Sequence, residues 1–142
     1  MAGTWSDPDR DEVERRIRGA AQLPGVEAVE TAGHTGFSVS GKRFAWLLVD
    51  HHDDGRLALH VKAPAGVQEA LLAERGCFSR PAYLGNRGWV AVDLDPAAGV
   101  DWDVVAELVE QAWRMSATKR LLAQRPSSLR TTAAGTWRPL HP

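Results

Sequence analysis

Basic, aromatic and amide side chains recur at positions where the chain is expected to turn or to face solvent. Cations bind phosphate groups, and flat or amide side chains contact bases, so this combination is typical of surfaces that bind nucleic acid. Most members are expected around two hairpin tips, and the others end a strand or the last helix. The candidate nucleic-acid-binding residues are Lys42, Arg43, Lys62, Arg80, Tyr83, Asn86, Arg87, Trp89 and Lys119.

The same residues also have a purely structural interpretation. Lys42 and Arg87 are ordinary soluble turn residues, and stacking of Arg80, Tyr83 and Trp89 would brace the second hairpin. Cations near the end of the last helix stabilise the negative end of its dipole. A dedicated duplex binder usually has an isoelectric point above about 9, whereas this chain has one of 6.5.

Charge is unevenly distributed along the chain. Residues 1–110 contain 11 basic and 18 acidic residues, whereas residues 111–142 contain six basic residues and no acid. A basic end attracts a polyanion, so this asymmetry is a hint about partners.

Other chemistries have weaker signals. The run 51–54, two His followed by two Asp, has metal-ligand side chains, but neighbouring residues in an extended segment point opposite ways, and such runs are common in solvated turns. Cys77 lacks a motif that would bring it to His34 or His60 as a nucleophile. The glycines of 33–36 are explained by a backbone turn. We therefore expect no enzyme, no metal and no cofactor.

The composition is that of a soluble globular chain. Its 142 residues are 44% hydrophobic and 25% charged, which is enough for one core. We expect one domain over 1–124 and a loosely ordered basic tail, rich in Pro, Ser and Thr, over 125–142. The chain has no apolar run of membrane-spanning length, no signal-peptide pattern and one cysteine, so we expect a cytoplasmic protein that does not bind a membrane.

Apolar residues at helical spacing predict three helices. The first spans about 7–22 with Asp7 as its N-cap, the second 65–75, and the third 101–122 with Asp101 as its N-cap. The third is the main core helix, and its expected inward residues are Trp102, Val105, Leu108, Val109, Ala112, Trp113 and Ser116.

Alternation of apolar and polar residues predicts the strands. An edge strand starts at Val26, a hairpin spans 37–48 with its turn at 40–42, a strand covers 56–62, and a second hairpin spans 81–94. In the first hairpin the apolar face of the returning strand should carry Phe44, Trp46 and Leu48. In the second hairpin the expected strands are 81–84 and 89–94, with Trp89 on the solvent face.

The order and spacing of these signals resemble the MmcQ/YjbR family over about residues 8 to 122. The segments that carry the resemblance are Gly41-Lys42-Arg43-Phe44-Ala45, Lys62, Arg80-Pro81-Ala82-Tyr83, Gly88-Trp89-Val90 and Ala117-Thr118-Lys119-Arg120. The resemblance implies an α+β fold, similar to frataxin-like and secretion-chaperone-like folds, with helices packed on one face of an antiparallel sheet and two hairpins. It also implies DNA binding without catalysis.

Two functions follow as expectations. The first is DNA binding through the hairpin tips and the basic end of the last helix. The alternative is a protein interaction or adaptor module that binds another protein, or a second copy of itself, through the sheet face.

Overall fold

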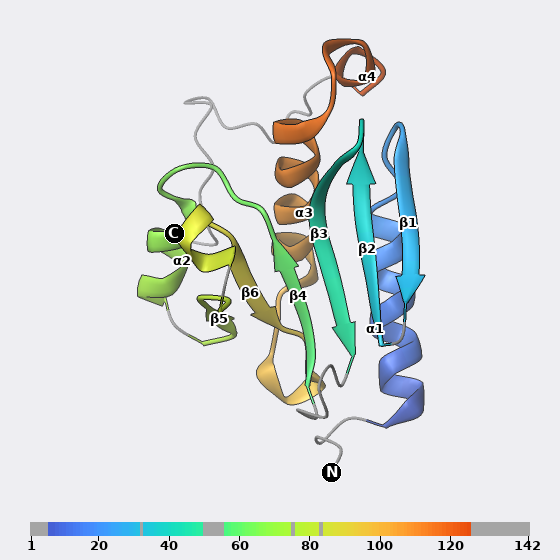
Figure 1. Cartoon of the computed structure of the whole chain (residues 1–142). Helices are drawn as coiled ribbons and strands as arrows, with labels where there is room; N and C mark the ends of the chain where they lie inside the picture. The colour runs from blue at the N-terminus through green and yellow to red at the C-terminus, as the bar shows by residue number, and fades with distance from the viewer. Residues whose placement is uncertain (1–5, 32, 50–55, 75, 83, 126–142) are drawn as a thin grey trace.

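Six antiparallel strands form one sheet, and two long helices cover one of its faces (Figure 1). The structure is a computed structural model that describes residues 6–31, 33–49, 56–74, 76–82 and 84–125. The elements are α1 (Asp7–Ala20), β1 (Val26–Thr31), β2 (His34–Val39), β3 (Lys42–Val49), β4 (Leu57–Val61), α2 (Val67–Glu74), β5 (Phe78–Ser79), the 3-10 helix η2 (Leu84–Arg87), β6 (Val90–Asp93), the 3-10 helix η3 (Pro96–Ala98), α3 (Trp102–Ser116) and α4 (Lys119–Ala123). The strand order is β1-β2-β3-β4-β6-β5. The predicted α+β fold class is confirmed.

Helix α1 begins one residue earlier than predicted. Ser6, rather than Asp7, is the N-cap, and it forms a capping box with Asp9. The amide of Ser6 donates to Oδ2 of Asp9 at 2.8 Å, and the amide of Asp9 donates to Oγ of Ser6 at 3.3 Å. The exchange satisfies two backbone donors at the start of the helix. Helix α1 buries Val13 and Ile17 against the core.

The hairpin of β2 and β3 contains a bulge that breaks simple alternation. Its turn residues Ser40 and Gly41 have φ values of 54° and 76°, which suits a tight turn between twisted strands. Phe37 pairs with Ala45, but Ser38 pairs with Arg43, so Phe44 is an extra residue. Both Phe44 and Ala45 are therefore buried.

The prediction that Phe44, Trp46 and Leu48 share the apolar face of β3 is wrong because of this bulge. Beyond it, Leu47 faces the core with 1% exposure, whereas Trp46 and Leu48 are half-buried on the other side of the sheet. A bulge shifts the facing of every residue that follows it.

The second hairpin is also different from the prediction. Its first strand, β5, has two residues, and the predicted strand 81–84 is wrong because Leu84 begins η2. Residues 90–93 form the second strand, β6, which lies between β4 and β5. Gln68 of α2 holds the connection, since its side-chain amide donates to the carbonyls of Gly85 at 2.9 Å and Trp89 at 2.7 Å.

The predicted long helix is broken at Ala117. This residue has φ −75° and ψ 152°, and the next residue, Thr118, caps the separate helix α4. Asp101 is the N-cap of α3 as predicted. Six of the seven expected inward residues are buried, and the exception, Trp102, is only partly buried.

The end of α3 is fastened to the turn that precedes β1. Trp113 is fully buried, and its Nε1 donates to the carbonyl of Pro24 at 2.9 Å. Leu121 of α4 covers Gly25, where a Cβ would lie 2.7 Å from the Leu121 Cδ1. The remaining core fills the space between the helices and the sheet, where Val105 of α3 is buried with the inward residues Phe37 of β2 and Leu59 of β4.

Candidate nucleic-acid interface

The face of the sheet turned away from α1 and α3 presents one row of residues that crosses all six strands. Each member is the direct partner of the next in the strand pairing, and all of them lie opposite the core side. The row is Val29, Gly36, Trp46, His60, Ala91 and Ser79. Two ring side chains thus stand beside each other at the middle of the row, flanked by a glycine and an alanine. We call this side of the sheet the open face.

Trp46 is the centre of a stacked cluster. The Cζ atom of Arg43 lies 4.3 Å from the centroid of the Trp46 ring, and the His34 ring meets Trp46 edge-on at a centroid distance of 5.2 Å. Gly36 makes room for this arrangement, because a Cβ there would overlap the Arg43 guanidinium and lie 2.9 Å from Cζ3 of Trp46. The cluster presents a positive charge held on an aromatic surface.

A pocket of about 280 Å³ lies on the other side of His60. Leu48, Ala58 and Ala91 contribute apolar surface, because the small alanines of β4 and β6 leave a hollow between larger neighbours. Arg56, Arg80 and Asp93 add charged groups to the lining. Arg80 crosses Gly85, where a Cβ would lie 2.5 Å from the Arg80 Cγ, and its Nη2 donates to Oδ1 of Asn86 at 2.8 Å.

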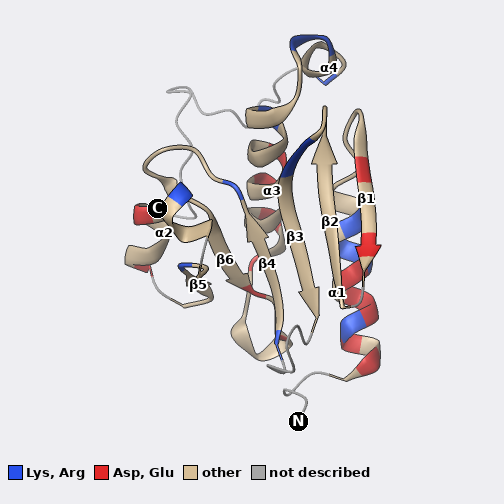
Figure 2. Cartoon of the chain, in the orientation of Figure 1, with Lys and Arg blue, Asp and Glu red and all other residues tan. Residues whose placement is uncertain are grey.

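Positive charge dominates the described part of this face between β2 and β6. Arg43 stacks on Trp46, and Arg56 and Arg80 line the pocket, against the single carboxylate of Asp93. Most acidic positions lie on α1, β1, α2 and α3, as the red segments in Figure 2 show. The acidic total of the chain therefore does not describe the open face between β2 and β6.

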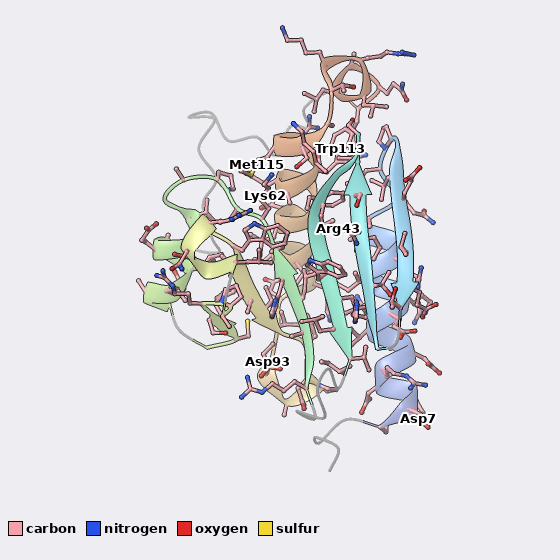
Figure 3. The ribbon with its side chains drawn as sticks, viewed as in Figure 1. Asp7, Arg43, Lys62, Asp93, Trp113 and Met115 are labelled. Atoms are coloured by element: carbon pink, nitrogen blue, oxygen red, sulfur yellow. The ribbon has the colours of Figure 1, made fainter. Side chains whose placement is uncertain are left out.

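The structure divides the predicted site residues into two groups. The first lies at one end of β3 and β4. Lys42 is exposed beside the turn, and Arg43 lies over β2 and β3 (Figure 3). The Lys62 amide donates to the carbonyl of Phe44 at 3.0 Å, which places Lys62, the residue after β4, next to the start of β3. The Lys62 ammonium lies 3.4 Å from Oγ of Ser116, so it points to the end of α3 rather than to a hairpin tip.

The second group lies on the connection between β5 and β6. Arg80 and Asn86 are joined by their hydrogen bond, and Arg87 is exposed at the end of η2. The predicted solvent-facing position of Trp89 is wrong, because its side chain is 5% exposed. Tyr83 lies outside the described residues.

Lys119 joins neither group. It is exposed in the first turn of α4, beyond the end of α3. The arginines of α3 and of the segment after α4 share one carboxylate partner. Arg114 and Arg125 both donate to Glu110, at 2.7 Å and 3.0 Å.

Several residues of the open face were not among the predicted site. His60 alternates with the buried residues Leu59 and Val61 and is only half-buried, so alternation along β4 indicates its outward position. Gly36 had been assigned to a turn, but it lies inside β2. The pocket alanines, Ala58 and Ala91, have no sequence signal, because their role depends on the pairing of strands distant in the chain.

Other candidate chemistries are located as follows. The His51–Asp54 run lies outside the described residues. Cys77 is half-buried, and burial raises the pKa of its thiol, with a further rise from the nearby charge of Asp93. Within the described ranges, no three His, Cys, Asp or Glu side chains are grouped as a metal site would require.

Among the described helices, none combines the length and apolar character needed to cross a bilayer.

Comparison with known proteins places this chain in a family. A YjbR family model matches residues 21–115. A solved structure with the same fold is that of protein DR2400 from Deinococcus radiodurans, which has a DUF419 domain. It is 20% identical, with a TM-score of 0.61, over 91% of this chain and 95% of that one. No curated protein sequence matches. The chain belongs to the YjbR family.

Proposed function

We propose that this protein binds DNA through the open face of its sheet and has no catalytic activity. The observation that carries the proposal is the stack of Arg43 on Trp46, at 4.3 Å, on a face where Arg56 and Arg80 line the neighbouring pocket. A guanidinium group forms paired hydrogen bonds with phosphate, and an aromatic ring stacks with bases. Both kinds of contact are available on one surface.

The overall charge of the chain is compatible with this proposal. Its formal net charge is −1, but binding responds to the local potential over the contact surface. The acidic residues of α1 lie across the sheet from Arg43, and two of them pair with neighbouring arginines: Asp11 with Arg10, and Glu12 with Arg15 and Arg16. Affinity is expected to be moderate and to depend strongly on salt.

The test is a fluorescence-polarisation titration of labelled DNA at about 50 and about 200 mM salt, a range in which phosphate contacts change affinity strongly. The variant is Arg43→Ala with Arg80→Ala. The matched control, Arg10→Ala with Arg15→Ala, removes two arginines from α1 on the other side of the sheet. Losing two phosphate contacts should reduce the slope of log affinity against log salt by about 1.4 for a single strand.

Three outcomes are informative. A selective loss of affinity and slope in the open-face variant supports the proposal. Equal losses in both variants would mean that binding follows total charge and not this face. Absence of binding at low salt would reject DNA as the partner.

A second candidate function is binding of another protein, or of a second copy, by the same face. Exposed apolar surface favours it: Val29 is 55% exposed, and Trp46 and Leu48 are only half-buried. Aromatic residues in an uncovered patch often anchor protein interfaces. Sedimentation that detects a complex insensitive to salt, together with no DNA binding, would favour this function over the first.

A further inference from the structure

The open face has raised and hollow parts, and their arrangement indicates which form of DNA it binds. Across the row, Trp46 and His60 form a raised pair of rings between Gly36 on β2 and Ala91 on β6. The Arg43 guanidinium occupies the low place beside Gly36. The low place beside Ala91 is the pocket of about 280 Å³. One side of the ridge is therefore filled by this chain's own side chain and the other is hollow.

We propose that this pocket accepts an unpaired base, so that the open face selects single-stranded over double-stranded DNA. The inference rests on the proposed DNA binding and names its substrate class. A volume of about 280 Å³ is at the lower limit of ligand pockets, which start at about 300 Å³. It suits one flat ring better than an extended cofactor. Leu48, Ala58 and Ala91 provide the apolar surface that such a ring would cover.

The charged lining fits a nucleotide in one orientation. Arg80 and Arg56 line the pocket, and arginine binds phosphate oxygens in a planar, bidentate manner. Asp93 pairs with Ala58 across β4 and β6. Its carboxylate repels phosphate and accepts a hydrogen bond from an exocyclic amino group of a base, as acidic side chains do with cytosine. The base is thus expected near Asp93, with its phosphates toward the arginines.

The shape of the site excludes a paired base. In a duplex the bases are stacked inside and expose only their groove edges, whereas an unpaired strand can turn its bases outward onto a protein surface. The pocket is a hollow on the open face, lined by residues of β4 and β6 and by the segment from Ser79 to Ala82. Neighbouring strands are about 4.8 Å apart, so the step from Trp46 to Ala91 is about two strand spacings. A single strand lying across the row would contact the Trp46 cluster and the pocket together.

The experiment compares a single strand with a duplex of the same length by polarisation, using Ala91→Leu to fill the pocket. The control, Ala106→Leu, makes the same change at an exposed position of α3, and circular dichroism checks the fold of both. We expect the wild type to prefer the single strand by about tenfold or more, the scale of one lost base stack. Ala91→Leu should remove most of this preference, so that the single strand binds little more tightly than the duplex.

A second measurement uses the wild-type protein, so the inference stays testable if Ala91→Leu fails to fold. Deoxycytidine monophosphate is titrated while amide NMR signals of Ala58, His60 and Ala91 are followed, with deoxyribose 5-phosphate as the control lacking a base. Shifts with the nucleotide alone support the inference. Equal shifts with both ligands would overturn it, since the base would then contribute nothing.

The failures of the two proposals are distinguishable. If duplex binds as tightly as the single strand and Ala91→Leu binds both like the wild type, the base pocket is rejected while DNA binding stands. If neither DNA binds at about 50 mM salt, where phosphate contacts are strong, both are rejected.

Discussion

The side-chain amide of Gln68 donates a hydrogen bond of 2.7 Å to the carbonyl oxygen of Trp89. The same amide reaches Gly85 at 2.9 Å, and Gln68 itself is only 6% exposed. One buried side chain on α2 therefore holds both ends of the connection that carries Asn86 and Arg87. The position of one half of the candidate site depends on a residue that does not belong to it.

Replacing Gln68 by Met should destabilise the protein by about 2 kcal/mol, because two buried carbonyls lose their donor. The matched control is Gln22→Met, which makes the same change at an exposed position. Urea unfolding measures the free energy of unfolding for both variants. Equal stability of the two would mean that solvent replaces the Gln68 amide.

Trp113→Phe should cost about 1 to 3 kcal/mol, since it leaves the carbonyl of Pro24 without its donor and creates a small cavity. Trp102→Phe is the comparison, because Trp102 is only partly buried. Thermal unfolding followed by circular dichroism gives the difference. A larger loss for Trp102 would show that the turn before β1 is not fastened through Trp113.

Gly36→Ala should displace the Arg43 guanidinium from Trp46, because the new methyl group would occupy its place. The loss in free energy of unfolding caused by Gly36→Ala should be about 1 kcal/mol smaller in a protein that already carries Arg43→Ala, as expected for residues in direct contact. The measurement is a double-mutant cycle from urea unfolding. Additive effects of the two changes would contradict the assigned packing.

The stability of the α3 end should depend on acid pH. Burial opposes ionisation of Glu110, but hydrogen bonds from Arg125 and Arg114 outweigh it and lower the pKa of Glu110 below its ordinary value of 4.5. A carboxyl whose pKa is lower in the folded state stabilises the fold above its unfolded pKa, and this contribution is lost as the pH falls through the folded pKa.

Glu110→Gln should therefore reduce stability by about 0.5 to 1 kcal/mol at pH 7, since the partly exposed pair is screened by solvent. The difference from the wild type should shrink below about pH 4.5. Unfolding by urea from pH 3 to pH 7 measures it, with the exposed Glu74→Gln as control. A difference that does not change with pH would exclude the ion pairs as its cause.

The helices were the more predictable part of the fold. Asp101 is the N-cap of α3, and apolar residues at three- and four-residue spacing after it identify a buried face that includes Val105 and Trp113. The break at Ala117 was missed because Lys119, Arg120 and the residues that follow continue in good helix formers. Thr118 is the local signal for a new N-cap.

The strands were predicted where alternation is uninterrupted, as from Leu57 to Val61 in β4. Alternation failed after Phe44, where a bulge adds one residue to β3. Alternation also failed for residues 81–84, which belong to an irregular connection that leads into η2. The hydrogen bond from Gln68 to Gly85 holds this connection, and nothing in the sequence indicates it.

The candidate site was less predictable because it is a property of pairing between strands. Arg43 and Arg80 were found from their residue types, but the row through Gly36, His60 and Ala91 depends on the insertion of β6 between β4 and β5. Such a row combines residues more than 50 positions apart, and single-strand periodicity contains no information about it.

Strand β1 ends the sheet, and its sequence limits how the sheet can grow. A second copy that paired its own β1 antiparallel through this edge would turn its open face to the same side, so opposite residues would differ by an even number of positions. In the register centred on Ala28, Glu27 and Glu30 of each copy would lie opposite Val29 and Val26 of the other. Such pairing would place charged side chains against apolar ones, and charged residues on outer strands are a general protection against edge-to-edge association. The two glutamates are therefore expected to disfavour growth of the sheet through β1.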